Sequence, residues 1–282
     1  MNLSVRTCWL PKGGNSVDEY EDAFDCSILG RRFAIADGAT ESSFAAPWAK
    51  SLVSGFIETP PFDSSQPGTR MKDWIEPLQK LWREGIDWQA LPWYSEEKAR
   101  AGAFSSLLGF EIETHDDSRE SSPGLTSRDV LRWRALAVGD SCLFHVSGDA
   151  LVASFPLRKA NEFGNRPLLL SSNPQNNEAV WTEVRYHDGA CHPADMFILA
   201  TDALAHWFLR CYESGSKPWK DLFSLNTEGD FAAFVAHSRE NHLMSNDDTT
   251  LLLVSIDNGV VEIRESADQK EMRPIEDCKE AI

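Results

Sequence analysis

Basic residues are scarce in this 282-residue sequence. Its 27 lysines and arginines stand against 44 aspartates and glutamates, which gives a formal net charge of −17. An anionic surface repels nucleic-acid backbones and acidic lipids, so we expect no nucleic acid and no membrane as partner. Long hydrophobic runs are missing too. The most apolar stretch, residues 196–209, is too short to cross a bilayer and contains Asp202 and His206.

Cysteine is also sparse, and its six copies form no Cys-x-x-Cys pair. The first residues, Met1 to Arg6, contain no apolar signal core, and together these features predict a reduced, cytoplasmic protein. The sequence has no His-x-x-x-His spacing, no Gly-x-Ser-x-Gly elbow and no phosphate-binding glycine loop. The sequence therefore lacks the signatures of zinc enzymes, of serine hydrolases with a nucleophile elbow and of P-loop proteins.

Short apolar runs bounded by turn residues predict the strands. They cover residues 25–36 as a hairpin, 103–113, 132–138, 142–146, 151–155, 197–200, and 250–256 with 260–264 as a closing hairpin. Helical periodicity predicts helices from an N-cap at Ser42 or Ser43 to residue 57, and over 71–83, 204–212 and 231–242. Strands in consecutive groups with helices between the groups favour antiparallel sheets covered by helices, an α+β fold.

Three features of the organisation follow from the same patterns. Residues 132–155 are expected to form a β-meander, and residues 158–191 a long surface excursion. No linker or repeat divides the chain. We therefore expect one domain over residues 1–265 and a poorly ordered tail over 266–282.

Acidic residues stand at the ends of five predicted buried strands. They are Glu21 and Asp22, Asp37, Asp140, Asp202, and the pair Asp247 and Asp248. A single acid in such a place is usually a helix cap or a solvated turn residue. Repetition at five strand ends favours a shared site, and a set of oxygen ligands suits hard cations such as Mg²⁺ and Mn²⁺.

Five motifs in this order resemble the metal-dependent protein serine/threonine phosphatases of type 2C, the PPM family. The motifs are Glu21-Asp22-Ala23, Ala36-Asp37-Gly38, Ala137-Val138-Gly139-Asp140-Ser141, Phe197-Ile198-Leu199-Ala200-Thr201-Asp202 and Asp247-Asp248-Thr249-Thr250. The resemblance spans about residues 1–265 and implies a four-layer α-β-β-α sandwich of two antiparallel sheets flanked by helices. It also implies a phosphoprotein phosphatase whose partner is a phosphorylated protein, a kinase or a kinase target.

The resemblance further implies a centre with two Mn²⁺ or Mg²⁺ ions at one end of the sandwich. Asp37 would bridge the two ions. Asp202 and Asp247 would complete one ion's site, and Glu21 with the backbone carbonyl of Gly38 the other. Water activated between two such ions hydrolyses phosphomonoesters.

Two further acids have roles implied by the resemblance. Asp22 would orient a metal-bound water, so Asp22 and Asp37 are the expected catalytic residues. Asp140 matches the aspartate that shares a third, weaker ion with the Asp202 position in some family members.

Two residues typical of the family are missing. Ala39 stands where most members have the histidine that protonates the leaving oxygen, and Val17 stands where they have a phosphate-binding arginine. Candidate replacements are Glu41 and His192 for the histidine, and Lys12, Arg6 and Arg158 for the arginine. These departures motivate one alternative, a regulatory domain that binds phosphoproteins without turnover. A phosphatase of small phosphorylated metabolites is a further alternative, which the net charge of −17 disfavours slightly without excluding it.

Overall fold

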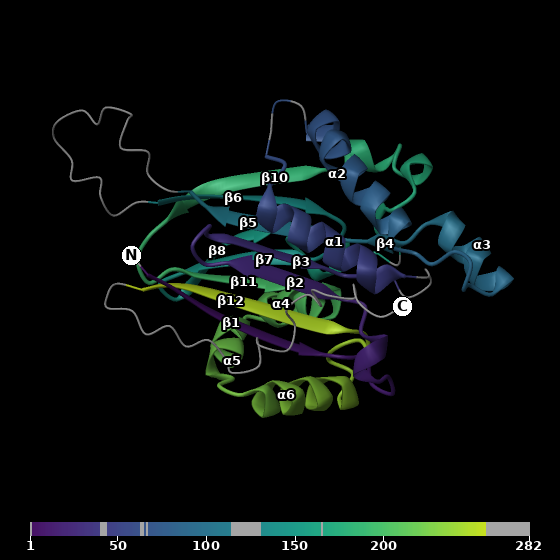
Figure 1. The fold of residues 1–282 in the computed structure, drawn as a ribbon. Coiled ribbons are helices and arrows are strands. Elements are labelled where there is room, and N and C mark those ends of the chain that lie inside the picture. Colours follow the sequence, from purple (N-terminus) through teal and green to yellow (C-terminus); the bar gives the residue numbers. More distant parts are fainter. Residues whose placement is uncertain are drawn as a thin grey trace, which may run out of the picture.

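The computed structural model describes residues 2–39, 44–62, 65, 67–113, 131–164 and 166–257. Two five-stranded antiparallel sheets lie face to face, with helices on both outer surfaces (Figure 1). This arrangement confirms the predicted four-layer α-β-β-α sandwich.

The first sheet contains, in spatial order, β1 (Asn2–Leu10), β12 (Thr249–Asp257), β11 (Met196–Ala200), β7 (Cys142–Ser147) and β8 (Ala150–Phe155). The second contains β10 (Arg185–Cys191), β6 (Leu131–Val138), β5 (Leu107–Ile112), β3 (Arg32–Ala36) and β2 (Ala23–Ser27). A short additional pair joins β4 (Phe104–Ser105) to β9 (Leu170–Ser171).

Strand β11 shows why the sheets are covered on both faces. Phe197 and Leu199 point into the core between the two sheets, whereas Ile198 and Ala200 pack against helices on the outer side. A strand that is apolar at every position loses its hydrophobic stabilisation unless both faces are buried. The same alternation recurs in β12, and two further hydrophobic cores therefore lie outside the sheets.

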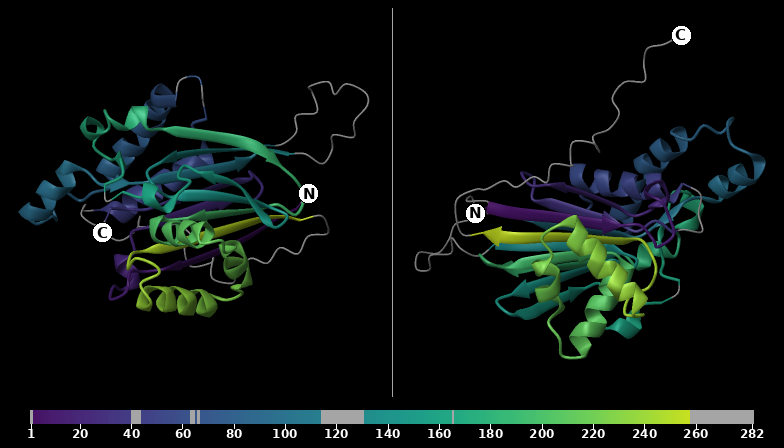
Figure 2. Two further views of the ribbon diagram at one scale, coloured as in Figure 1. Left: turned by 180° about the vertical axis from the view of Figure 1, so that it is seen from behind. Right: turned by 90° about the horizontal axis from the view of Figure 1, so that it is seen from below.

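Helices α1 (Ala45–Glu58) and α2 (Pro67–Glu84) cover the second sheet. Helices α4 (Asp202–Glu213), α5 (Pro218–Ser224) and α6 (Glu228–Glu240) cover the first, as the two further views in Figure 2 show. Helix α3 (Trp93–Ala101) extends beyond the end of the sandwich (Figure 1). None of the helices in these described ranges is long and apolar enough to cross a bilayer.

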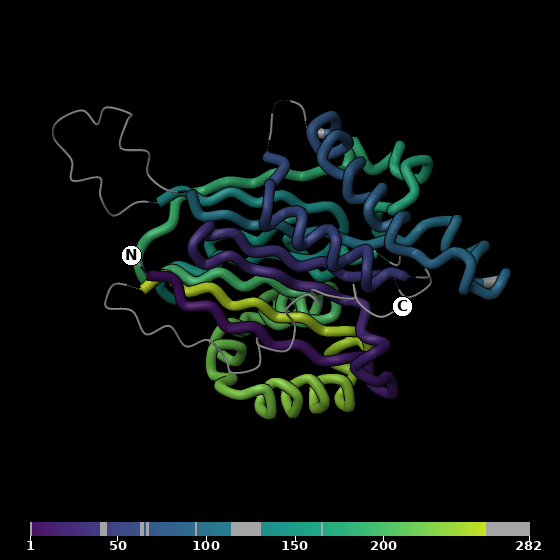
Figure 3. Tube along the Cα trace, viewed as in Figure 1, coloured from purple at the N-terminus to yellow at the C-terminus, as the bar shows by residue number. Residues whose placement is uncertain are grey.

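Strands β1 and β12 lie side by side although they are the first and last strands described (Figure 3). They pair from Asn2 opposite Asp257 to Leu10 opposite Thr249. The sequence patterns did not predict β1, α3 or α5. The predicted second strand of the closing hairpin, residues 260–264, and the tail over 266–282 lie outside the described residues.

The predicted β-meander over residues 132–155 was wrong. Strand β6 belongs to the second sheet and β7 to the first, and the chain crosses between the sheets at Gly139. Gly139 has a φ of +94°, and a Cβ there would lie 2.7 Å from the Cβ of Ser106. Only glycine fits this crossing without strain.

Two smaller predictions also need correction. Residues 158–191 are not an excursion throughout, because β9 pairs with β4 and β10 forms an edge strand of the second sheet. Helix α1 has Phe44, at φ 64°, as its N-cap residue rather than Ser42 or Ser43. Both serines lie outside the described residues.

Candidate metal centre

The strand registers bring the predicted acids to one end of the sandwich. Ala23 at the start of β2 pairs with Ala36 at the end of β3. Ala200 at the end of β11 aligns with Leu251 near the start of β12 and with Cys142 at the start of β7. An acid stands next to each of these strand ends. The acids gathered in this way are Asp22, Asp37, Asp140, Asp202 and Asp247, called here the acidic cluster.

The carboxylates of the acidic cluster raise one another's pKa. Burial, followed by the charges of Asp22, Asp202, Asp140 and Asp247, raises the pKa of Asp37 well above its ordinary value. Burial and the charges of Asp140 and Asp247 raise the pKa of Asp202 to about 7, and burial raises the pKa of Asp140 to about 6. The cluster therefore contains a repulsion that a bound cation would relieve.

Asp22 is the most constrained member of the cluster and is only 5% exposed. Its Oδ2 accepts a 2.6 Å hydrogen bond from the Thr250 hydroxyl, which lies 2.5 Å from the Tyr20 hydroxyl. Its Oδ1 has no hydrogen-bond partner in the described part of the chain. Burial, followed by the charges of Asp248 and Asp202, raises the pKa of Asp22 well above its ordinary value. A buried carboxylate oxygen of this kind requires a water or a cation as partner.

Serine side chains at the end of β4 and directly after it hold Asp37 in place. The Asp37 backbone N–H donates to Ser106 Oγ at 2.9 Å. The Asp37 carbonyl accepts from the Ser106 N–H at 2.8 Å and from Ser105 Oγ at 2.9 Å. Ser106 Oγ also lies 2.8 Å from Ser141 Oγ, next to Asp140, so a buried serine pair links two loops of the cluster.

Gly38 allows two segments of the site to approach each other. A Cβ at this position would lie 2.5 Å from the carbonyl oxygen of Glu21 and 3.1 Å from the Cβ of Ala45. Any side chain would therefore push the Glu21 segment away. The backbones of Glu21 and Gly38 are therefore in close contact, while their proposed role as ligands of one ion stays a prediction.

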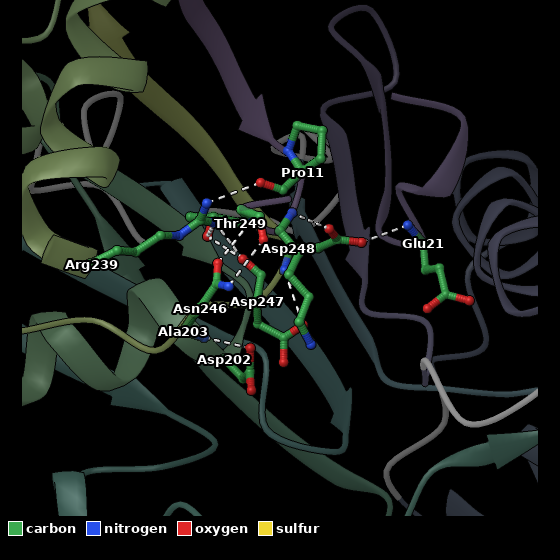
Figure 4. A network of polar contacts seen from close by, with 11 residues as sticks. Pro11, Glu21, Asp202, Ala203, Arg239, Asn246, Asp247, Asp248 and Thr249 are labelled. Atoms are coloured by element: carbon green, nitrogen blue, oxygen red, sulfur yellow. Dashed lines mark hydrogen bonds and ion pairs between the residues drawn. The ribbon is translucent and has the colours of Figure 1, made fainter. Parts of the chain in front are cut away.

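Asp247 and Asp248 differ in their contacts although they are adjacent. The Asp248 carboxylate accepts the backbone N–H groups of Lys12 and Glu21, each at 2.7 Å. The Asp247 carboxylate lies on the side of Asp202, and the carboxylate of Glu21 lies apart from both (Figure 4). Asp248 therefore holds backbone segments together, while Asp247 belongs to the acidic cluster.

Arg239 of α6 donates hydrogen bonds to the backbone and to a threonine next to the acidic cluster. Its Nη2 donates to the Asp247 carbonyl at 2.5 Å and to Thr249 Oγ1 at 3.0 Å, and its Nη1 donates to the Pro11 carbonyl at 3.0 Å (Figure 4). Burial lowers the pKa of Arg239, and the nearby charges of Asp248 and Asp247 oppose this shift. Sequence patterns had given no signal for Arg239, because it lies in an ordinary last helical turn.

The two candidate acids for the missing histidine have different positions. His192 lies at the opposite end of the sandwich, just after β10, where its backbone N–H donates to Asp195 Oδ2 at 2.9 Å. It is therefore too remote to replace the histidine, and Glu41 lies outside the described residues. Val17 is 63% exposed in a short 3₁₀ helix, Val17–Glu19.

The residues present fit a hard divalent cation. Within the described ranges, no group of three His, Cys, Asp or Glu side chains is arranged to hold a metal ion. The donors are all oxygens, they are desolvated, and Asp22 Oδ1 lacks a partner.

No protein-family model and no curated protein matches the sequence. Among solved structures, the PstP serine/threonine phosphatase catalytic domain in complex with 2 manganese ions matches at a TM-score of 0.54 and 11% identity, covering 91% of this chain and 99% of that one. The Mycobacterium tuberculosis phosphatase PstP/Ppp matches at 0.54 and 13%, covering 92% and 100%. The photosystem II phosphatase PBCP matches at 0.53 and 13%, covering 90% and 99%. The chain therefore has the fold of the PP2C-type, or PPM, serine/threonine phosphatases.

Proposed function

We propose that this protein is a metal-dependent phosphatase that hydrolyses phosphoserine or phosphothreonine in a protein substrate. The observation that carries the proposal is the acidic cluster: five carboxylates, one with an unpartnered buried oxygen, lie at one end of a PPM-type sandwich. Acids that repel one another in a desolvated site require a cation for their charged forms. The fold neighbours are phosphatases of serine and threonine, which supports the substrate class.

The residues that would hold two Mn²⁺ or Mg²⁺ ions are Asp37, Asp202 and Asp247, with Glu21 and the Gly38 carbonyl on the second ion and Asp140 at a third position. When bound, such ions supply the positive charge that polarises a phosphate and acidifies water. The chain's own contribution is positional. The Ser106 hydroxyl fixes the Asp37 backbone, and Gly38 keeps the Glu21 segment close.

Asp22 is the residue that would orient the attacking water. Its Oδ2 is held by the Thr250 hydroxyl at 2.6 Å. Because the single proton of Thr250 is used in this bond, the Tyr20 hydroxyl must donate to Thr250 at 2.5 Å. Asp22 Oδ1 is left without a partner among the described residues, and is therefore free to accept a hydrogen bond from water.

The proposed physiological partner is a phosphorylated protein, a kinase or a kinase target, in the cytoplasm. The second candidate function is a phosphoprotein-binding domain without turnover. It is favoured by Ala39, whose methyl group cannot act as an acid toward a leaving oxygen. It is also favoured by the exposed Val17, which has no charge to bind a phosphate. Both candidates use the same site and differ in turnover.

The deciding experiment measures hydrolysis of p-nitrophenyl phosphate and of a phosphoserine peptide with Mn²⁺, with Mg²⁺ and with a chelator. We expect turnover only with metal, and its loss in Asp37→Asn. Full hydrolysis after exhaustive metal removal would contradict the metal-dependent mechanism. Metal-dependent binding of the phosphopeptide without hydrolysis of either substrate would instead favour the binding domain.

A further inference from the structure

Lys12 places a positive charge beside the acidic cluster. Its Nζ lies 3.8 Å from Asp247 Oδ1. The charge of Lys12 also acts on Asp202, where it opposes the rise in pKa caused by burial and by the neighbouring acids. The ammonium group therefore lies beside Asp247 at the edge of the site.

The loop that carries Lys12 is tied to the loop before β12. The Lys12 backbone N–H donates to Asp248 Oδ1 at 2.7 Å, and the Gly13 N–H donates to Asn246 Oδ1 at 2.7 Å. Asn246 Nδ2 returns a 3.2 Å bond to the Gly13 carbonyl, and Arg239 holds the Pro11 carbonyl. These bonds fix the backbone of Lys12 at the site.

Two arginines, Arg239 and Arg6, direct their side chains into the protein. Arg239 directs its Nη1 and Nη2 groups to backbone carbonyls and to Thr249. Arg6 donates to the carbonyls of Leu225 and Phe223 at the end of α5. The Arg158 backbone N–H donates to the Glu162 carboxylate at 2.6 Å, which fixes the backbone of Arg158 and not its guanidinium group.

The contact between Lys12 and Asp247 is a weak one. At 3.8 Å, with side chains 36% and 42% exposed, it is an ion pair largely screened by water. A phosphate dianion offers a lysine more charge and more acceptor oxygens than one carboxylate. The acidic cluster itself repels such a dianion, so an anionic substrate needs a cation supplied by the protein.

We propose that Lys12 binds the phosphate group of the substrate at the edge of the acidic cluster. This inference rests on the proposed phosphatase function and adds a specificity-determining residue to it. The ligand class is a phosphomonoester or inorganic phosphate.

The test is calorimetric titration of inorganic phosphate into the Mn²⁺-loaded full chain, with KM and kcat for p-nitrophenyl phosphate measured in parallel. For Lys12→Gln and Lys12→Met, we expect the phosphate Kd and the KM to rise about tenfold or more, with a smaller change in kcat. Lys12→Arg should stay within about threefold of the unchanged protein because it keeps the charge. The substitutions preserve the backbone bond to Asp248, and thermal denaturation verifies folding.

Lys217→Gln is the matched control. Lys217 is also an exposed lysine paired with an aspartate, Asp149, but it lies by the turn before β8, at the other end of the sandwich. Its substitution should leave the phosphate Kd unchanged. Unchanged phosphate affinity in Lys12→Gln together with tighter Mn²⁺ binding would show that Lys12 is only a counter-ion of Asp247, and would overturn the proposal. Failure of the phosphatase function has a separate readout, because phosphate binding is measured without turnover.

Discussion

The carboxylate of Asp248 accepts a 2.7 Å hydrogen bond from the backbone N–H of Glu21, which lies 227 positions earlier in the sequence. Its other oxygen accepts the N–H of Lys12. One side chain thus joins the end of β1, the start of β2 and the start of β12 at the site. Its neighbour Asp247 belongs to the acidic cluster. Of these two adjacent acids, Asp248 therefore has a structural role and Asp247 a proposed metal-binding role.

Asp248→Ala should destabilise the protein. It leaves two backbone N–H groups without their charged acceptor, and we expect the free energy of unfolding to fall by about 2–4 kcal/mol in urea denaturation. Asp188→Ala, which removes an exposed partner of Arg132, should cost about 0–1 kcal/mol. Equal losses in the two variants would contradict the structural role of Asp248.

Asp37→Asn and Asp202→Asn should each reduce metal-dependent turnover by several orders of magnitude. Each substitution replaces a charged ligand by a neutral amide, which binds hard cations more weakly. Asp257→Asn is the control, because Asp257 is exposed at the far end of β12. Turnover of p-nitrophenyl phosphate and calorimetric Mn²⁺ affinity are the measurements. A similar loss in all three variants would show that the strand-end cluster is not the metal centre.

The metal-free protein should become less stable as pH rises from about 4 to about 7. The pKa of Asp202 is raised from 3.8 to about 7 and that of Asp140 to about 6, so the folded state binds more protons than the unfolded state in this interval. The stability that these groups contribute is complete below their unfolded pKa and is lost as pH rises through the folded values. Thermal denaturation with chelator should show a falling Tm across this range.

Saturating Mn²⁺ should remove most of that pH dependence, because the ion stabilises the charged carboxylates that the metal-free fold disfavours. The comparison is the Tm at each pH with Mn²⁺ and with chelator. A metal-free Tm that rises between pH 5 and pH 8 has the wrong sign and would refute the assignment of these groups.

Ala39 predicts a steep dependence of rate on the acidity of the leaving group. Without a general acid at this position, aryl phosphates should be hydrolysed faster than phosphoserine. Ala39→His should narrow the difference by about 10²-fold or more if the imidazole reaches the leaving oxygen. Rates for a series of substituted phenyl phosphates at fixed Mn²⁺ test this expectation. A flat dependence in the natural protein, with no gain in Ala39→His, would mean that another residue already acts as the acid.

The sequence alone determined the strands that carry the site and the α+β fold class. Runs such as Phe197 to Ala200 are apolar at every position, and short runs of this kind are typical of strands buried on both faces. Acids directly after or before these runs had to emerge at the rim of a core. The order of the five motifs then indicated the four-layer sandwich, which the structure confirms.

Only the tertiary structure decided which sheet each strand joins and which polar groups meet. Strands β6 and β7 lie in different sheets but have similar apolar patterns. Local periodicity therefore could not reveal that the chain crosses between the sheets at Gly139. The bonds of Asp248 to Glu21 and of Ser106 to Asp37 join groups far apart in the chain. Such contacts depend on three-dimensional proximity and leave no periodic signal, which is why Lys12 acquired a defined place at the site only in the folded chain.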